Sequence, residues 1–124
     1  MAIIRIYTGA DGKSHFQDIE PDFQEDDQSV GGKKWPLDAT AVIHEESGII
    51  ARRFDPERSN PWHYAPGRAC AFTLSGAVEI EIGDGTKRIL GPGDILIAED
   101  LTGQGHYTRG VGSEPRVTVF VPLM

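Results

Sequence analysis

The chain has 124 residues, of which 39% are hydrophobic and 25% are charged, and these are values typical of one globular domain. With 19 acidic and 12 basic residues, its net charge is -7 at pH 7. Nucleic-acid binding needs a clustered positive face, and the basic residues here are scattered among acids. We therefore expect no nucleic-acid partner.

Cellular location is indicated by what the chain lacks. Cys70 is the only cysteine, so no disulfide can form within the chain. The N-terminal residues do not combine the basic and apolar stretches of a signal peptide. No apolar run approaches the roughly 20 residues of a membrane span. We expect a cytoplasmic protein with no membrane partner.

The first third of the chain predicts two strands and a loop. Residues 3–7 and 15–19 read as short strands around a turn that begins and ends in glycine, Gly9 and Gly12. Residues 20–34 are rich in acids and close on Gly31 and Gly32. We expect this stretch to be a solvated loop.

From residue 39 onward, short strands recur at regular spacing. Period-two alternation predicts strands over residues 40–45, 49–54, 69–75, 77–82, 87–90, 95–98, 104–109 and 116–121. Turns at Gly83–Gly85 and Gly91–Gly93 are expected at hairpin ends. Many short strands with turns between them indicate an all-β sandwich or barrel, here one domain over residues 1–124.

Two stretches carry paired motifs. The first runs from Trp62-His63-Tyr64-Ala65-Pro66 to Phe72-Thr73-Leu74-Ser75-Gly76, and the second from Leu90-Gly91-Pro92-Gly93-Asp94 to Gly105-His106. In combination they resemble the motifs of the cupin superfamily, in its subgroup of small single-domain members (monocupins) of mostly unassigned function. The resemblance implies a cupin-type jelly-roll β-barrel (double-stranded β-helix) and a homodimer.

The resemblance also implies a metal-ligand pattern from which this chain departs. Metal-binding members carry a His-x-His pair, a Glu and a third His, and these positions fall on His63, Ala65, Ala69 and His106. Alanine cannot coordinate a metal, and a divalent site normally needs at least three protein ligands. We therefore expect no tightly bound metal in the usual four-ligand arrangement. A divalent ion would need His63 and His106 together with His44, Glu45 or Glu46.

The two remaining motif histidines, His63 and His106, are the candidate catalytic and ligand-binding residues. The resemblance implies that both point into one cavity, where a neutral imidazole can bind a ligand or carry a proton. Thr73 shares the parity of Ala69 and should line the same cavity. Arg68 lies at the end of the loop after His63, where its guanidinium either orients a ligand carboxylate near the barrel mouth or forms a surface ion pair with one of the acidic residues.

Two aromatic residues flank His63. With period two, Trp62 and Tyr64 face away from it, which favours packing against the N-terminal strands or at a dimer interface. Tyr64 is kept as a further candidate ligand contact. Cys70 alternates with alanines on the cavity side, so we expect it to face away from the cavity.

Three functions remain open. The leading interpretation is a small-molecule-binding cupin whose pocket is built around His63 and His106. If this cupin is an enzyme, we expect it to act on a small polar or anionic substrate by proton transfer. The alternatives are a divalent-metal-dependent oxygenase or isomerase and a non-enzymatic ligand sensor or interaction module. The fold alone does not choose among them.

Overall fold

The computed structural model describes residues 1–25 and 35–124, and this part of the chain is all β. Its strands are β1 (Ile3–Thr8), β2 (Ser14–Ile19), β3 (Gln24–Glu25), β4 (Ala39–His44), β5 (Ile49–Phe54), β6 (Ser59–His63), β7 (Ala69–Ser75), β8 (Ala77–Glu81), β9 (Lys87–Leu90), β10 (Ile95–Ala98), β11 (His106–Val111) and β12 (Arg116–Pro122). The predicted all-β architecture is confirmed.

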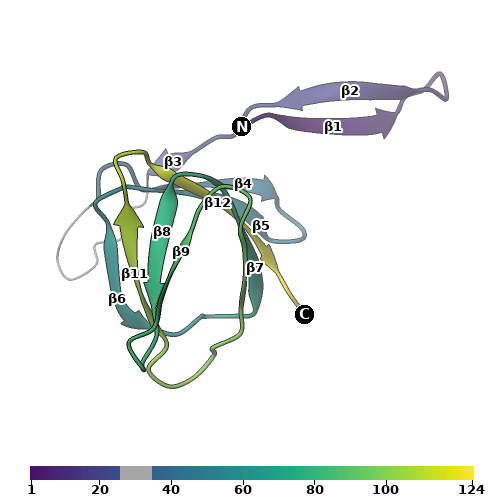
Figure 1. Cartoon of the computed structure of the whole chain (residues 1–124). Coiled ribbons are helices and arrows are strands. Elements are labelled where there is room, and N and C mark those ends of the chain that lie inside the picture. The colour runs from purple at the N-terminus through teal and green to yellow at the C-terminus, as the bar shows by residue number, and fades with distance from the viewer. Residues whose placement is uncertain (26–34) are drawn as a thin grey trace.

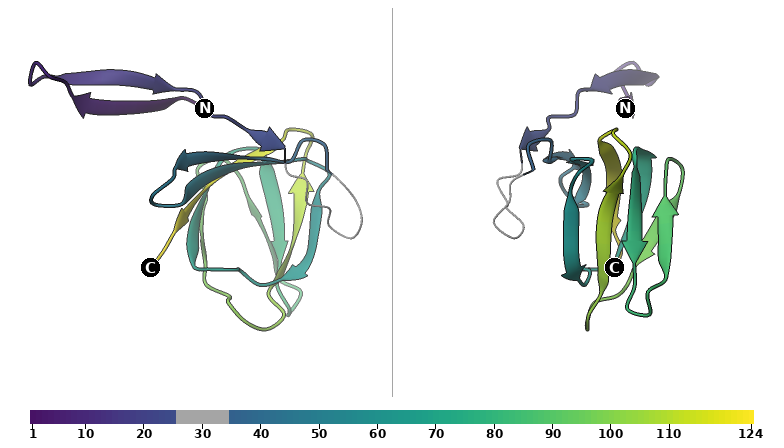
Figure 2. Two further views of the ribbon diagram at one scale, coloured as in Figure 1. Left: turned by 180° about the vertical axis from the view of Figure 1, so that it is seen from behind. Right: turned by 60° about the vertical axis from the view of Figure 1, so that its left-hand side comes forward.

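Two antiparallel sheets form the barrel. The larger has the order β10-β7-β12-β5-β4-β3, and the smaller has the order β6-β11-β8-β9. The strands of both sheets wrap around a common interior, as Figures 1 and 2 show. Strand neighbours far apart in sequence, such as β5 beside β12 and β6 beside β11, close the structure into a jelly roll.

The buried apolar residues of the described part are mostly small. Five of these eight residues are alanines, namely Ala39, Ala41, Ala51, Ala65 and Ala71. On β7 the inward positions are occupied by Ala69, Ala71 and Thr73, and on β12 the inward Thr118 is fully buried. Small inward side chains do not fill a barrel of this size, so its interior keeps an open cavity.

The N-terminal hairpin stands apart from the barrel. β1 and β2 are hydrogen-bonded to each other and not to the two barrel sheets, and Figures 1 and 2 show them extending away from it. Its apolar side chains Ile4, Ile6 and Phe16 are exposed, with 79% of Phe16 accessible. The two predicted strands are therefore present, and the predicted homodimer stays a prediction.

Two predictions from the sequence need correction. The loop expected over residues 20–34 contains a short strand, because β3 pairs with β4 through Gln24 and Thr40, while residues 26–34 lie outside the described part. The turn at Gly91–Gly93 does not close a hairpin: β9 pairs with β8, whereas β10 pairs with β7 in the other sheet. Local turn chemistry sets the bend, but tertiary contacts choose the partner strand. The turn at Gly83–Gly85 does join the paired strands β8 and β9, as predicted.

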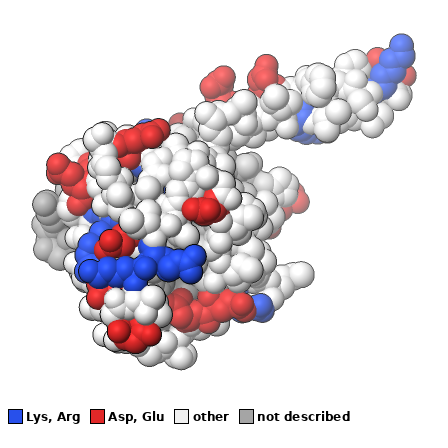
Figure 3. Space-filling view, viewed as in Figure 1, with Lys and Arg blue, Asp and Glu red and all other residues white. Residues whose placement is uncertain are grey.

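Charge on the face shown in Figure 3 is mixed, with a blue band of basic side chains bordered by acidic ones. In the described residues, no helix is long and apolar enough to cross a membrane.

Candidate functional site

A cavity of about 580 Å³ occupies the barrel interior and is lined by both sheets. Pockets of roughly 300–1,000 Å³ accommodate small organic molecules. Much of its wall is apolar, provided by Ile50, Val78, Ile80, Leu90, Leu96 and Phe120. Polar and charged side chains also line it, among them the two motif histidines and the arginines around Phe54.

His63 and His106 lie together in this cavity. They are register partners at the end of β6 and the start of β11, and their ring centroids are 4.4 Å apart. Gly105 makes this close approach feasible, because a Cβ atom there would lie 1.9 Å from the carbonyl oxygen of His63. It also has a positive φ of 73°, which other residues adopt only with strain.

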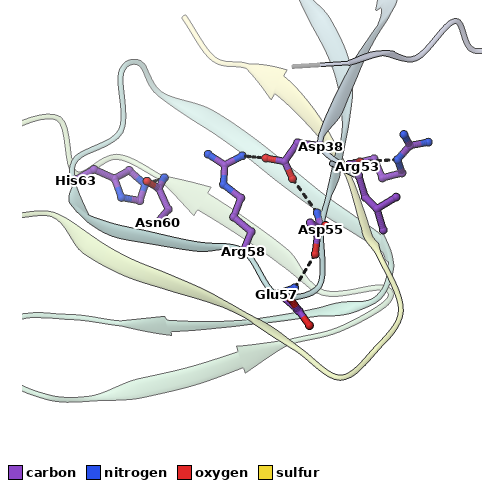
Figure 4. A network of polar contacts seen from close by, with 8 residues as sticks. Asp38, Arg53, Asp55, Glu57, Arg58, Asn60 and His63 are labelled. Atoms are coloured by element: carbon purple, nitrogen blue, oxygen red, sulfur yellow. Dashed lines mark hydrogen bonds and ion pairs between the residues drawn. The ribbon is translucent and has the colours of Figure 1, made fainter. Parts of the chain in front are cut away.

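The hydrogen bonds of His63 fix its tautomer. Its Nδ1 lies 2.8 Å from the carbonyl oxygen of Pro61, and because a carbonyl can only accept, Nδ1 carries the proton. The Nε2 atom then accepts from the side-chain amide of Asn60 at 3.2 Å. Figure 4 shows Asn60 beside the ring, with Arg58 next along the segment.

Its surroundings favour the neutral form of His63. Burial lowers the pKa of His63, and the nearby His106 and Arg58 lower it further, against opposing contributions from the Pro61 carbonyl and Asp100. A ring with a lowered pKa is uncharged near pH 7.

His106 has a carboxylate partner that the sequence did not reveal. Its Nδ1 lies 2.6 Å from Oδ2 of Asp100, so the Nδ1 proton is donated to the carboxylate and the lone pair of the neutral ring is on Nε2. Asp100 is itself held in place, because its backbone carbonyl accepts the N–H of Ala65 at 2.9 Å. Asp100 belongs to the loop between β10 and β11, where no sequence signal specified a role for it.

The other predicted ligand contacts have different positions. Thr73 lines the cavity and is buried. Arg68 also lines it, but its guanidinium is bound by Glu99 at 2.8 and 2.9 Å and donates to the carbonyl of Met124. Tyr64 is 53% exposed and is not among the cavity-lining residues, in keeping with its parity opposite to His63. Trp62 packs edge-on against Tyr107, with ring centroids 6.0 Å apart.

The donor set does not fit the metal site of the family. Ala65 and Ala69 line the cavity at two ligand positions and offer no donor atom. His44 bonds to Ser47 near the β4–β5 turn, and neither it nor Glu45 and Glu46 line the cavity. Within residues 1–25 and 35–124, no three His, Cys, Asp or Glu side chains are grouped so that they could hold a metal ion.

Three arginines that sequence reasoning missed also line the cavity. Arg52 comes from β5, Arg58 precedes β6, and Arg116 begins β12. The period-two pattern could have indicated two of them, because Arg52 shares its parity with Ile50 and Phe54, and Arg116 shares its parity with Thr118 and Phe120.

Residues 51–122 match the cupin domain family. The chain is a cupin. No curated protein matches it. Among solved structures, this cupin is similar to an uncharacterised conserved protein with a double-stranded β-helix domain from Klebsiella pneumoniae, with 26% identity, a TM-score of 0.51, and coverage of 77% of this chain and 82% of that one.

Two further structures share the fold at lower identity. One is the polyketide cyclase RemF from Streptomyces resistomycificus, with 18% identity, a TM-score of 0.59, and coverage of 83% of this cupin and 74% of that chain. The other is the cupin domain of Cnp3 from Schizosaccharomyces pombe, with 12% identity, a TM-score of 0.56, and coverage of 98% and 88% respectively. One of these structures is a cyclase and the other is a domain of Cnp3, so a shared fold leaves the function of this cupin open.

Proposed function

We propose that the barrel cavity binds a small polar organic molecule and that His106 exchanges a proton with it. The observation that supports this most directly is the Asp100–His106 pair, with a 2.6 Å hydrogen bond, at the wall of a cavity of about 580 Å³. A carboxylate at Nδ1 holds the ring in the tautomer whose Nε2 accepts a proton, and it stabilises the imidazolium that forms.

The proposed step balances within one molecule. Nε2 of His106 takes a proton from the bound molecule and returns it to another atom of that molecule, so no oxidant, reductant or second reactant is consumed. The adjacent His63 ring is neutral, because burial lowers its pKa, and so it places no positive charge beside the imidazolium. The chemistry is therefore that of an isomerisation or cyclisation driven by proton transfer.

The metal-dependent alternative has less support. Two of the four family ligand positions are alanines, and the additional donors considered from the sequence lie outside the cavity lining. We therefore assign no step to a metal ion.

The test is hydrogen exchange into simple ketones in heavy water, followed by proton NMR. Levulinate and methyl propyl ketone share a methyl ketone whose neighbouring C–H groups exchange slowly without a catalyst. We expect the wild-type protein to accelerate exchange in at least one of them, and His106→Asn to lose about 10²-fold or more of that rate. Asp100→Asn should lose rate as well, because the ring is no longer oriented.

His44→Asn is the matched control, because it removes a histidine outside the cavity lining. Equal exchange by the wild-type protein and His106→Asn would contradict the proposal. If a ketone binds but its C–H groups do not exchange, the proposed proton-transfer function is wrong and a ligand sensor is the better interpretation.

A further inference from the structure

Three guanidinium groups surround one aromatic ring at the cavity wall. The Cζ atoms of Arg116, Arg52 and Arg58 lie 3.9, 4.7 and 5.3 Å from the centroid of Phe54. All four side chains line the same cavity as His63 and His106. We call these three arginines and Phe54 the arginine cluster.

Arg58 already has a carboxylate partner within the barrel wall. Asp38, which is 2% exposed, pairs with Arg58 and also accepts the backbone N–H of Asp55 at 2.8 Å. Asp55 lines the cavity, and its own carboxylate accepts the backbone N–H of Glu57. Asp38 is therefore engaged by Arg58, and it forms no ion pair with Arg116. Figure 4 shows Arg58 directed toward Asp38 and Asp38 reaching toward Asp55.

Arg116 has few partners among the described residues. Its Nη1 donates to the neutral hydroxyl of Thr118 at 3.3 Å. Its Nε is shielded from solvent and has no hydrogen-bond partner among the described residues. No carboxylate of the described residues forms an ion pair with it, whereas Arg58 and Arg68 each have one.

Arg116 nevertheless remains charged near neutral pH. Burial lowers its pKa to about 10, and the like charges of Arg52 and Arg58 contribute to the shift, with Asp38 opposing it. A buried cation without a counter-ion is costly, and stacking on an aromatic ring offsets only part of that cost. An anion in the cavity would offset more of it.

From the Arg116 guanidinium, which has no carboxylate partner among the described residues, and resting on the function proposed above, we propose that the arginine cluster is the subsite for a carboxylate group of the ligand. The forked guanidinium of Arg116 binds the carboxylate, Arg52 adds attraction, and Arg58 is positioned by Asp38. The uncharged part of the ligand then occupies the apolar interior toward His63 and His106. The substrate class is therefore a small organic acid whose reactive carbon lies at the end of the molecule opposite the carboxylate.

The test compares each carboxylate with a neutral molecule of similar shape. Levulinate is paired with methyl propyl ketone, and acetate with acetamide, and binding is measured by calorimetry at constant ionic strength. We expect at least one carboxylate to bind about tenfold or more tightly than its neutral counterpart. Arg116→Met should remove that preference while leaving the binding of the neutral molecule within about twofold. Arg88→Met, at an exposed position of β9, is the charge-matched control and should leave the preference unchanged.

A second measurement does not depend on the choice of ligand. If Arg116 is kept for a ligand and not for the fold, unliganded Arg116→Met should have a midpoint of thermal unfolding at or above that of the wild type. A clear drop would assign Arg116 a structural role and overturn the proposal. So would equal binding of both members of each pair by the wild-type protein.

The two proposals fail separately. Levulinate that binds through Arg116 without exchanging protons would retain the carboxylate subsite and remove the role of His106. Exchange in the neutral ketone at the same rate and affinity as in levulinate would retain the role of His106 and remove the subsite.

Discussion

His63 and His106 meet across one register pair of β6 and β11 with their ring centroids 4.4 Å apart, yet their partners differ in charge. His63 donates to a neutral backbone carbonyl, whereas His106 donates to the carboxylate of Asp100. The two rings are therefore not equivalent, and of the two only His106 has a negatively charged hydrogen-bond partner among the described residues. This asymmetry is the basis for assigning proton transfer to His106.

The lowered pKa of His63 predicts a stability that depends on pH. Because the folded pKa lies below the ordinary value of 6.5, the unfolded chain binds the proton more readily. The contribution of this group is therefore present above pH 6.5 and is lost as the pH falls through the folded pKa. We expect the midpoint of urea unfolding to fall on acidification in this window, and the fall to be smaller in His63→Asn. An unchanged pH profile in His63→Asn, with His44→Asn as the control, would contradict the neutral state of His63.

Gly105 predicts a large effect of one methyl group. Gly105→Ala would place a Cβ atom 1.9 Å from the carbonyl oxygen of His63, at a φ of 73°. We expect a loss of about 3 kcal/mol or more in the free energy of unfolding, measured by urea denaturation. Gly103→Ala is the matched control, since it also has a positive φ but has nothing within 4 Å of its Cβ position, and it should cost only about 1 kcal/mol. Similar losses in both variants would show that backbone strain alone, not the approach of His63, is responsible.

Asp38 and Arg58 form a buried pair whose side chains are only 2% and 10% exposed. Asp38→Asn leaves the Arg58 charge without its partner, and we expect it to cost about 3–5 kcal/mol of unfolding free energy. Removing the charge as well, in Asp38→Asn with Arg58→Met, should cost less than the sum of the two single variants. Chemical denaturation of the four proteins measures this coupling. Additive losses would mean that the two groups do not interact across the cavity wall.

The alanines at two family ligand positions predict that metal affinity can be introduced. Ala65 and Ala69 both line the cavity, so Ala65→His with Ala69→Glu would place four donors around it. We expect this double variant, purified without an affinity tag, to bind roughly one zinc or nickel ion per chain. The wild-type protein should not retain metal under the same dialysis, as followed by elemental analysis. Stoichiometric metal in the wild type would promote the metal-dependent alternative.

The N-terminal hairpin is predicted to be separable from the barrel. Because β1 and β2, among the strands that the structure describes, pair only with each other, deleting residues 1–19 removes no described strand pairing from either barrel sheet. We expect the thermal midpoint of the barrel to move by no more than about 4 °C, measured by circular dichroism. Loss of the cooperative transition would show that the hairpin is part of the barrel's fold. Sedimentation of the full and shortened chains checks the predicted homodimer.

Sequence alone determined the class of fold, because alternation and turn chemistry are local properties. The strand at residues 49–54, the Gly83–Gly85 hairpin and the two motif histidines were all readable in this way. The partner strand of β10 could not be predicted from the sequence, because the Gly91–Gly93 turn bends the chain whether or not the strands on its two sides pair with each other. The arginine cluster and the Asp38–Arg58 pair depend on residues 52, 58, 116 and 38, which only the closed barrel brings together. The charge of the cavity is a property of those long-range contacts, and it is therefore decided by the tertiary structure.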